Sequence, residues 1–121
     1  DAEDVNRWNI LHPKDDYRIP FVTKCLAHTK GPVVAVSDYV RLVAEQISPF
    51  ISGTFTALGT DGFGRSETRQ ELRRFFEIDK HYIILAALNT LAKDGQIQLD
   101  EVGKAIKMYN IDTEKPNPKS V

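Results

Sequence analysis

The sequence predicts a three-layer α/β/α fold built on a mostly parallel sheet. Two short segments, residues 33–36 and 54–58, are β-prone, and each is followed by a segment with helical spacing. A continuous β-branched run such as residues 33–36 is typical of a strand that is buried on both faces. Because two parallel strands make a poor stand-alone sheet, we expect further strands to come from elsewhere in the protein.

Length and composition indicate one domain with one core. The 121 residues are 41% hydrophobic and 27% charged, which is the balance of a folded globular chain. A chain of this size can bury roughly two-thirds of its unfolded surface without help from disulfides or a metal. We expect a helical lead-in over residues 1–30, an α/β body over 31–112 and an irregular tail over 113–121.

Charge and cysteine content argue against several classes of function. Sixteen basic and seventeen acidic residues give a net charge of -1 without a long block of one sign, so nucleic acid and anionic membrane are not expected as partners. Cys25 is the single cysteine, which excludes an internal disulfide and a multi-cysteine metal site. No apolar run approaches the roughly 20 residues that cross a bilayer, and the acidic start is unlike a signal peptide. We therefore expect a reducing, cytoplasmic setting. Because the chain lacks an initiator Met, we also expect it to be a piece of a longer protein.

Two short helices are predicted in the lead-in, around residues 5–11 and 21–26, because apolar residues recur there at helical spacing. A turn-prone Pro-Lys-Asp-Asp stretch separates them. Cys25 lies among apolar residues of the second helix and is interpreted as a small core residue.

The body begins after Gly31 and Pro32 with the predicted strand at residues 33–36. Ser37 or Asp38 can then cap a helix that runs to about residue 50. Pro49 is expected to forbid further regular turns.

A second strand and helix follow at residues 54–58 and 67–76, joined by a glycine-rich turn. Ser66 can cap this helix, while Thr68 with Glu71 offers a capping box one turn later.

Two more helices are predicted before the tail. Asp79 is the expected N-cap of the first, and Gly95 ends it. Residues 82–88 are apolar on every side, so this helix is expected at the centre of the fold or at an interface. The last helix spans about residues 100–109.

The string Leu58-Gly-Thr-Asp-Gly-Phe-Gly-Arg-Ser66 is the most informative motif. Its glycines allow positive φ, and Arg65 beside a helix N-terminus would suit a phosphate or carboxylate. The string is not a dinucleotide fingerprint, because Glu67 stands where the third glycine belongs, and it lacks the Gly-Lys-Ser/Thr of a P-loop. We favour a structural turn that packs against another domain or subunit, with an anion site as the alternative. The candidate contact residues are Asp61, Gly62, Phe63, Gly64 and Arg65.

The remaining polar residues indicate no assembled catalytic or metal site. The three histidines, His12, His28 and His81, have no partner at metal-ligand spacing and are interpreted as solvated or hydrogen-bonded side chains. Four arginines interleave with three glutamates, which predicts a solvated helix face with local ion pairs and leaves a partner-binding patch as the alternative. These residues are Arg65, Arg69, Arg73, Arg74, Glu67, Glu71 and Glu77.

The glycine string, followed by Arg69, Leu72-Arg73, Phe76-Glu77 and Asp79, resembles the C-terminal domain of the homodimeric bacterial pyruvate dehydrogenase decarboxylating subunits. The resemblance extends over nearly the whole chain, in the stretches Arg7-Trp8-Asn9, Leu11-His12-Pro13, Ser37-Asp38-Tyr39, Ala44-Glu45-Gln46, Ala86-Ala87-Leu88, Leu91-Ala92-Lys93 and Tyr109-Asn110-Ile111-Asp112. It implies a transketolase C-terminal-domain-like fold, with a mostly parallel five-stranded sheet between helices. This chain would lack the first strand-helix-strand unit of that domain.

The same resemblance implies a function for the longer protein. In such enzymes thiamine diphosphate and magnesium bind between two upstream domains, through a Gly-Asp-Gly and Asn-Asn motif that does not occur here. We therefore expect a non-catalytic assembly and dimerisation domain, inactive alone, of an enzyme that oxidatively decarboxylates pyruvate and acetylates the lipoyl carrier. The implied partners are the rest of its subunit, a second subunit and the dihydrolipoyl acetyltransferase. The alternatives are a related transketolase-like or 2-oxoacid dehydrogenase subunit, and an independent anion-binding α/β module.

Overall fold

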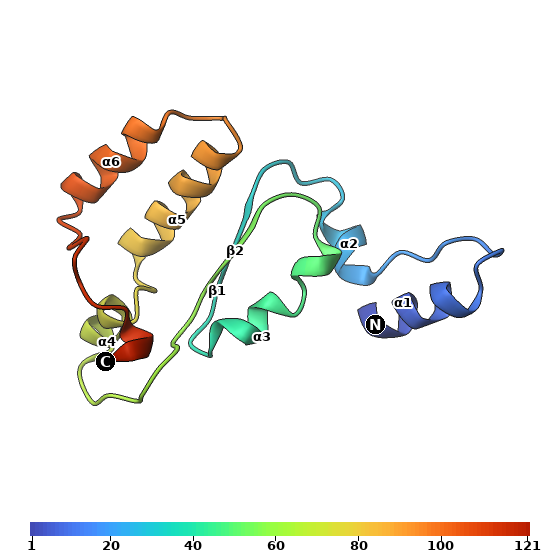
Figure 1. Ribbon diagram of the computed structural model, residues 1–121, viewed down its shortest axis with the longest axis horizontal. Coiled ribbons are helices and arrows are strands. Elements are labelled where there is room, and N and C mark those ends of the chain that lie inside the picture. The colour runs from blue at the N-terminus through green and yellow to red at the C-terminus, as the bar shows by residue number, and fades with distance from the viewer.

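The computed structural model describes residues 1–121 as six α-helices, two strands and two short 3-10 helices (Figure 1). In chain order these are α1 (Ala2–Leu11), α2 (Phe21–Leu26), β1 (Val33–Val36), α3 (Arg41–Glu45), η1 (Ser48–Phe50), β2 (Phe55–Leu58), α4 (Arg69–Phe75), α5 (Lys80–Lys93), α6 (Leu99–Met108) and η2 (Pro118–Ser120). None of the helices combines the length and the apolar composition that a membrane crossing requires.

The two strands pair in parallel, with Val33 opposite Phe55 and Val36 opposite Leu58. Both α3 and α5 pack against the sheet, and they lie on opposite sides of it (Figure 1). Helix α6 packs against α5. This arrangement confirms the predicted α/β/α layering. Because the sheet has two strands, the outer edge of each strand has no ladder partner.

Helix α5 is attached to the sheet through a buried hydroxyl. Thr90 is 1% exposed, and its hydroxyl donates to the carbonyl oxygen of Ala86 at 2.6 Å. The same hydroxyl lies 3.2 Å from the hydroxyl of Thr56 in β2. Burying it therefore leaves no unpaired polar atom, which would otherwise be costly. The place of α5 between the sheet and α6 confirms the prediction from its apolar run.

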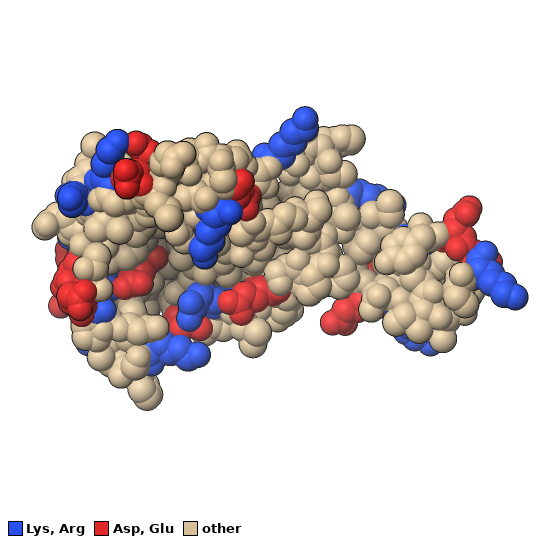
Figure 2. Space-filling view, turned by 45° about the horizontal axis from the view of Figure 1, so that its top comes forward, with Lys and Arg blue, Asp and Glu red and all other residues tan.

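The core is smaller than the composition predicts. Six of 121 residues are buried, and Ile78 and Ala105 are the buried hydrophobic ones. The chain exposes 8970 Å², whereas a folded monomer of its mass exposes about 6,600 Å² and its unfolded chain about 19,900 Å². It thus buries about 55% of its unfolded surface, not two-thirds. Uncharged surface covers most of the face seen in Figure 2. Exposed large apolar residues include Tyr17, Phe21, Tyr39, Leu42, Phe63, Leu99 and Met108.

Helix α3 is shorter than the predicted helix. The Ser37 hydroxyl accepts a hydrogen bond from the backbone N–H of Tyr39 at 3.0 Å, so it closes a turn instead of capping the helix. The N-cap position falls on Val40, whose side chain makes no capping bond. Pro49 does not end regular structure, because it lies in η1, where a proline near the first position needs no N–H partner.

The caps of α4 and α5 explain where these helices begin. Thr68, not Ser66, caps α4, accepting a hydrogen bond from the Glu71 N–H at 3.3 Å, so the helix starts later than predicted. Asp79 caps α5 as predicted, accepting hydrogen bonds from the N–H groups of His81 at 2.9 Å and Tyr82 at 3.0 Å.

Cys25 is exposed, so its interpretation as a core residue is wrong. The hydroxyl of Thr23 donates to the carbonyl oxygen of Phe50, which turns the Thr23 side of α2 toward η1. Cys25 follows two positions later and lies on the other side of the helix.

We expect Gly59→Ala to lower the free energy of unfolding by about 1–3 kcal/mol, because the added Cβ has no room. A Cβ at Gly59 would lie 2.5 Å from the Tyr39 carbonyl oxygen and 2.7 Å from the Arg41 nitrogen. Gly103→Ala in α6 is the matched control, since no atom lies within 4 Å of its added Cβ. The control should gain about 0.5–1 kcal/mol. Urea titration measures both, and equal midpoints would contradict the steric argument.

Candidate functional site

The glycine turn, defined here as residues 59–65, leaves β2 and is held against the start of α3. The N–H of Thr60 donates to the Tyr39 carbonyl oxygen at 2.9 Å, and its hydroxyl donates to the Asp38 carbonyl oxygen at 2.7 Å. Gly59 is buried at this contact, where backbone meets backbone. The first residues of the turn are therefore fixed by the chain itself.

Asp61 joins the turn to α3 by an ion pair. One carboxylate oxygen accepts hydrogen bonds from Arg41, at 2.9 Å from Nε and 3.2 Å from the backbone nitrogen. Burial raises the pKa of Asp61, but the hydrogen bonds and charge of Arg41, helped by Lys119, outweigh it and hold the pKa below its usual value. The predicted contact residue Asp61 thus has an internal partner.

The C-terminal tail braces the other side of the turn. Gly62 has φ +112°, and a Cβ there would lie 2.6 Å from the carbonyl oxygen of Pro118. Pro118 itself is a buried residue. Lys115 donates to the carbonyl oxygens of Arg74 and Phe75 at the end of α4, and its Nζ lies 3.3 Å from the Glu77 carboxylate. A lysine at a helix C-terminus satisfies the carbonyl groups that lack helical partners. Within the predicted irregular tail, Pro118–Ser120 form the short 3-10 helix η2, while residues 115–117 have no regular secondary structure.

The outer part of the turn faces solvent. Phe63 is 80% exposed. A Cβ at Gly64 would meet no atom within 4 Å. The guanidinium of Arg65 lies over the ring of Phe75, 4.2 Å from its centroid. Arg65 is thus directed to the last residue of α4 and not to a helix N-terminus, an arrangement that favours the structural turn over the anion site.

A groove of about 460 Å³ opens beside the turn. Its apolar lining comes from Phe63 and, on the side of α4 and the loop that follows it, Leu72, Phe76 and Ile78. Arg65, Arg69 and Arg73 also line it. An apolar floor with charged groups around it suits a protein segment that inserts a hydrophobic side chain.

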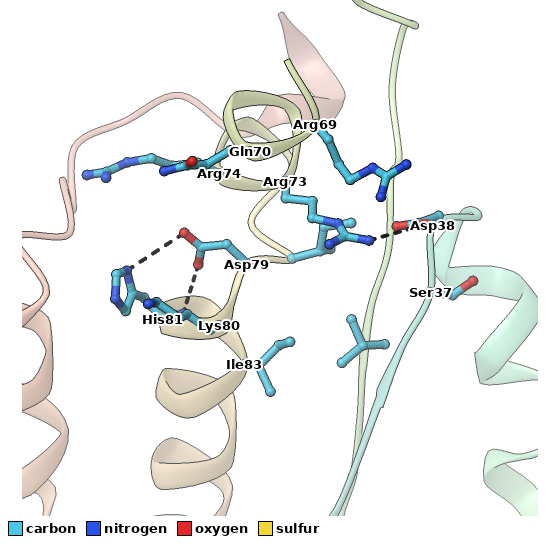
Figure 3. A pocket seen from close by; sticks show the side chains of 12 residues that line it. Ser37, Asp38, Arg69, Gln70, Arg73, Arg74, Asp79, Lys80, His81 and Ile83 are labelled. Carbon is cyan, nitrogen blue, oxygen red and sulfur yellow. Dashed lines mark hydrogen bonds and ion pairs between the residues drawn. The ribbon is translucent and has the colours of Figure 1, made fainter. Parts of the chain in front are cut away.

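A larger cleft of about 880 Å³ adjoins this groove and shares Arg69 and Arg73 with it. It lies between the end of β1, helix α4 and the first turn of α5 (Figure 3). We name it the α4–α5 cleft. Spacing in the sequence did not reveal it, because its walls come from three separate segments. The adjacent arginines of α4 were the available signal.

None of the four arginines of this region pairs with the interleaved glutamates, so the predicted local ion pairs are absent. Arg73 instead lies 3.8 Å from Asp38 at the end of β1. Glu77 pairs with Lys115. The tertiary fold therefore pairs Arg73 and Glu77 with residues distant in the sequence instead of with their neighbours.

The histidines take structural positions. His12 stacks on Trp8 with ring centroids 4.3 Å apart, and His81 stacks on Tyr109 at 4.6 Å. His28 is exposed.

Near His81, burial raises the pKa of the Tyr82 hydroxyl above its usual range, and neighbouring carboxylates raise it further.

No three His, Cys, Asp or Glu residues lie together in a way that could hold a metal ion. Magnesium sites that include a phosphate ligand use only one or two carboxylates, so this finding concerns metal sites built from protein side chains alone.

We expect Asp61→Asn to lower the free energy of unfolding by about 1 kcal/mol at pH 7, since Arg41 is partly exposed and water screens the pair. The lowered pKa means that the ionised pair stabilises the fold above the unfolded pKa of about 3.9. This stability is lost as the pH falls through the folded pKa, so the difference between variant and parent should vanish in acid. Urea titrations at several pH values measure it. Asp16→Asn is the control, because Asp16 is exposed and has no ion pair or hydrogen bond, and identical pH profiles for both variants would contradict the role of Asp61.

Comparisons with known proteins bear on the whole chain. Residues 5–79 match the family model described as the transketolase-like TK C-terminal domain. The Pyruvate dehydrogenase E1 component of Cupriavidus necator is 53% identical over 121 residues, which are 100% of this chain and 14% of that protein. The protein of the same name from Pseudomonas aeruginosa is 50% identical over 94% of this chain and 13% of its own length. The one from Escherichia coli K12 is 43% identical over 98% of this chain and 13% of its own length.

This chain spans about one-seventh of the length of these curated relatives. The family match covers more than half of the chain, from within α1 to the N-cap of α5. Together with the parallel strands and their helices, it confirms the resemblance found in the sequence. The chain therefore belongs to the transketolase-like C-terminal domain family.

Proposed function

We propose that this chain is the C-terminal, non-catalytic assembly domain of a pyruvate dehydrogenase decarboxylating subunit. The longer protein would oxidatively decarboxylate pyruvate and acetylate a lipoyl carrier. The relatives named Pyruvate dehydrogenase E1 component support this enzyme class, because they match nearly all of the chain. In this proposal thiamine diphosphate and magnesium are held by residues outside these 121.

The observation that carries the assembly role is the accessible area. The chain exposes 8970 Å², about 2,400 Å² more than a folded monomer of its mass. One partner in a standard protein interface contributes about 800 Å². The surplus is therefore large enough for extensive packing against other domains or a second subunit, and the exposed apolar side chains supply its hydrophobic part.

The glycine turn is our candidate contact within this surface. It combines an exposed aromatic, Phe63, with an arginine, and both residue types are enriched at protein interfaces. The bonds of Thr60 and Asp61 and the buried Pro118 hold the backbone around it. A contact presented on an ordered backbone loses less conformational entropy on binding. The proposed partners are the remaining domains of the subunit and a second subunit, with the dihydrolipoyl acetyltransferase as the partner of the assembled enzyme.

In the longer protein, we expect Phe63→Ala and Arg65→Glu each to weaken subunit association or turnover. The loss should be about 30-fold or more, the scale of a hot-spot residue. Sedimentation velocity across a concentration series and pyruvate turnover measure it. Lys107→Glu is the matched charge control, since Lys107 is exposed on α6. Association and turnover unchanged in the turn variants would remove the turn from the interface.

Calorimetry of the 121-residue chain should show no binding of thiamine diphosphate, inorganic phosphate or nucleotides. The reason is that Arg65 is directed to Phe75 and no metal-ligand group is assembled. A cooperative urea transition verifies that the titrated sample is folded. Saturable binding of any of these compounds would favour the independent anion-binding module instead.

A further inference from the structure

The α4–α5 cleft carries more positive than negative charge. Its lining includes four cations, Arg69, Arg73, Arg74 and Lys80, and two carboxylates, those of Asp38 and Asp79. The chain as a whole has a net charge of -1, so the cleft differs in sign from the molecule around it. Charge of one sign in a cleft focuses the electrostatic field and selects partners of opposite charge.

The two carboxylates leave the cleft with a net positive charge. Asp79 is engaged as the cap of α5 and lies 3.8 Å from His81. Asp38 is 3.8 Å from Arg73, beyond the length of a hydrogen bond, and its side chain is 74% exposed. Arg69 and Lys80 make no ion pair. Figure 3 shows Arg69 and Arg73 extending from α4 toward the end of β1, while Arg74 points away.

The geometry favours several carboxylates on a chain over one small anion. A helix N-terminus binds phosphate through free N–H groups, but those of His81 and Tyr82 at the start of α5 are taken by Asp79. What the cleft offers is side-chain charge spread across two helices. Arg69 and Arg73 are four positions apart in α4, which places them about 6 Å apart at their Cβ atoms. Guanidinium groups at this spacing can each engage a carboxylate of one peptide segment.

We propose that the α4–α5 cleft docks an acidic protein segment from outside these 121 residues, one that places at least two carboxylates against Arg69, Arg73 and Lys80. The inference rests on the proposed assembly function and names the chemistry of the partner surface. The adjoining groove lets the same segment insert an apolar side chain against Leu72 and Phe76. The arginines set its position, and the apolar contact adds affinity.

Zero-length carbodiimide cross-linking of the assembled longer protein tests the proposal, because this reagent joins a lysine amine to a touching carboxylate with loss of water. We expect mass spectrometry to find Lys80 linked to an Asp or Glu outside residues 1–121. The yield should fall several-fold when the salt concentration is raised to about 1 M, where the screening length is about 3 Å. Lys80 linked to Asp38 or Asp79 alone, or unlinked while other lysines react, would overturn the proposal.

Charge reversal supplies the second readout. The double variant R69E/R73E should lower the yield of the Lys80 cross-link at least tenfold. The neutral variant R69Q/R73Q should lower this yield by a smaller factor. K14E/K30E is the matched control, since both lysines are exposed, lie in loops and have no ion pair. Far-ultraviolet circular dichroism verifies the fold of each variant. A cross-link that persists in R69E/R73E would overturn the proposal.

Different results would contradict the contact function of the glycine turn and the acidic segment in the α4–α5 cleft. If Phe63→Ala and Arg65→Glu leave association and turnover unchanged, the proposed contact function of the turn fails. If those variants weaken association while R69E/R73E retains the Lys80 cross-link, the acidic partner segment alone fails.

Discussion

The close approach of the glycine turn to the start of α3 is the constraint on which the rest of the structure depends. Gly59 lies so near the Tyr39 carbonyl oxygen that no side chain fits, and Thr60 bonds to the backbone there. The ion pair of Asp61 with Arg41 closes the same junction. Because α3 follows β1 and the turn follows β2, this junction ties the ends of both strands to one helix and holds the parallel pair in register.

Polar attachments of this kind replace part of the apolar core. Thr90 joins α5 to Thr56 in β2, and Lys115 joins the tail to the end of α4. Each uses groups whose hydrogen-bonding capacity is satisfied inside the chain, which avoids the cost of burying unpaired polar atoms. With so few buried apolar residues, these attachments define the arrangement of elements while leaving a wide apolar surface free. Such a division suits a domain that completes its packing against other parts of a protein.

The groove beside the glycine turn and the α4–α5 cleft are both lined by α4, so one short helix links the two candidate surfaces. Arg65 packs on Phe75 at the end of α4, and Arg69 and Arg73 line both cavities. The tail reaches the same helix through Lys115. The end of β1, the glycine turn, α4 and the C-terminal tail therefore converge here, and Phe63 is presented on a backbone that the chain itself supports.

Local rules were sufficient for much of this protein. The apolar runs and spacing predicted both strands and all six helices, Asp79 was recognisable as a cap, and the glycine string carried the family resemblance. These features depend on neighbours within a few residues, which sequence periodicity reports directly. Cys25, the ordered tail, the partner of Asp61 and the cleft depended on contacts between segments 20 or more positions apart, for which one sequence holds no distance information. Only the tertiary structure could decide them, because an exposed cysteine, an engaged carboxylate and an unpaired arginine have the same local sequence signature as their opposites.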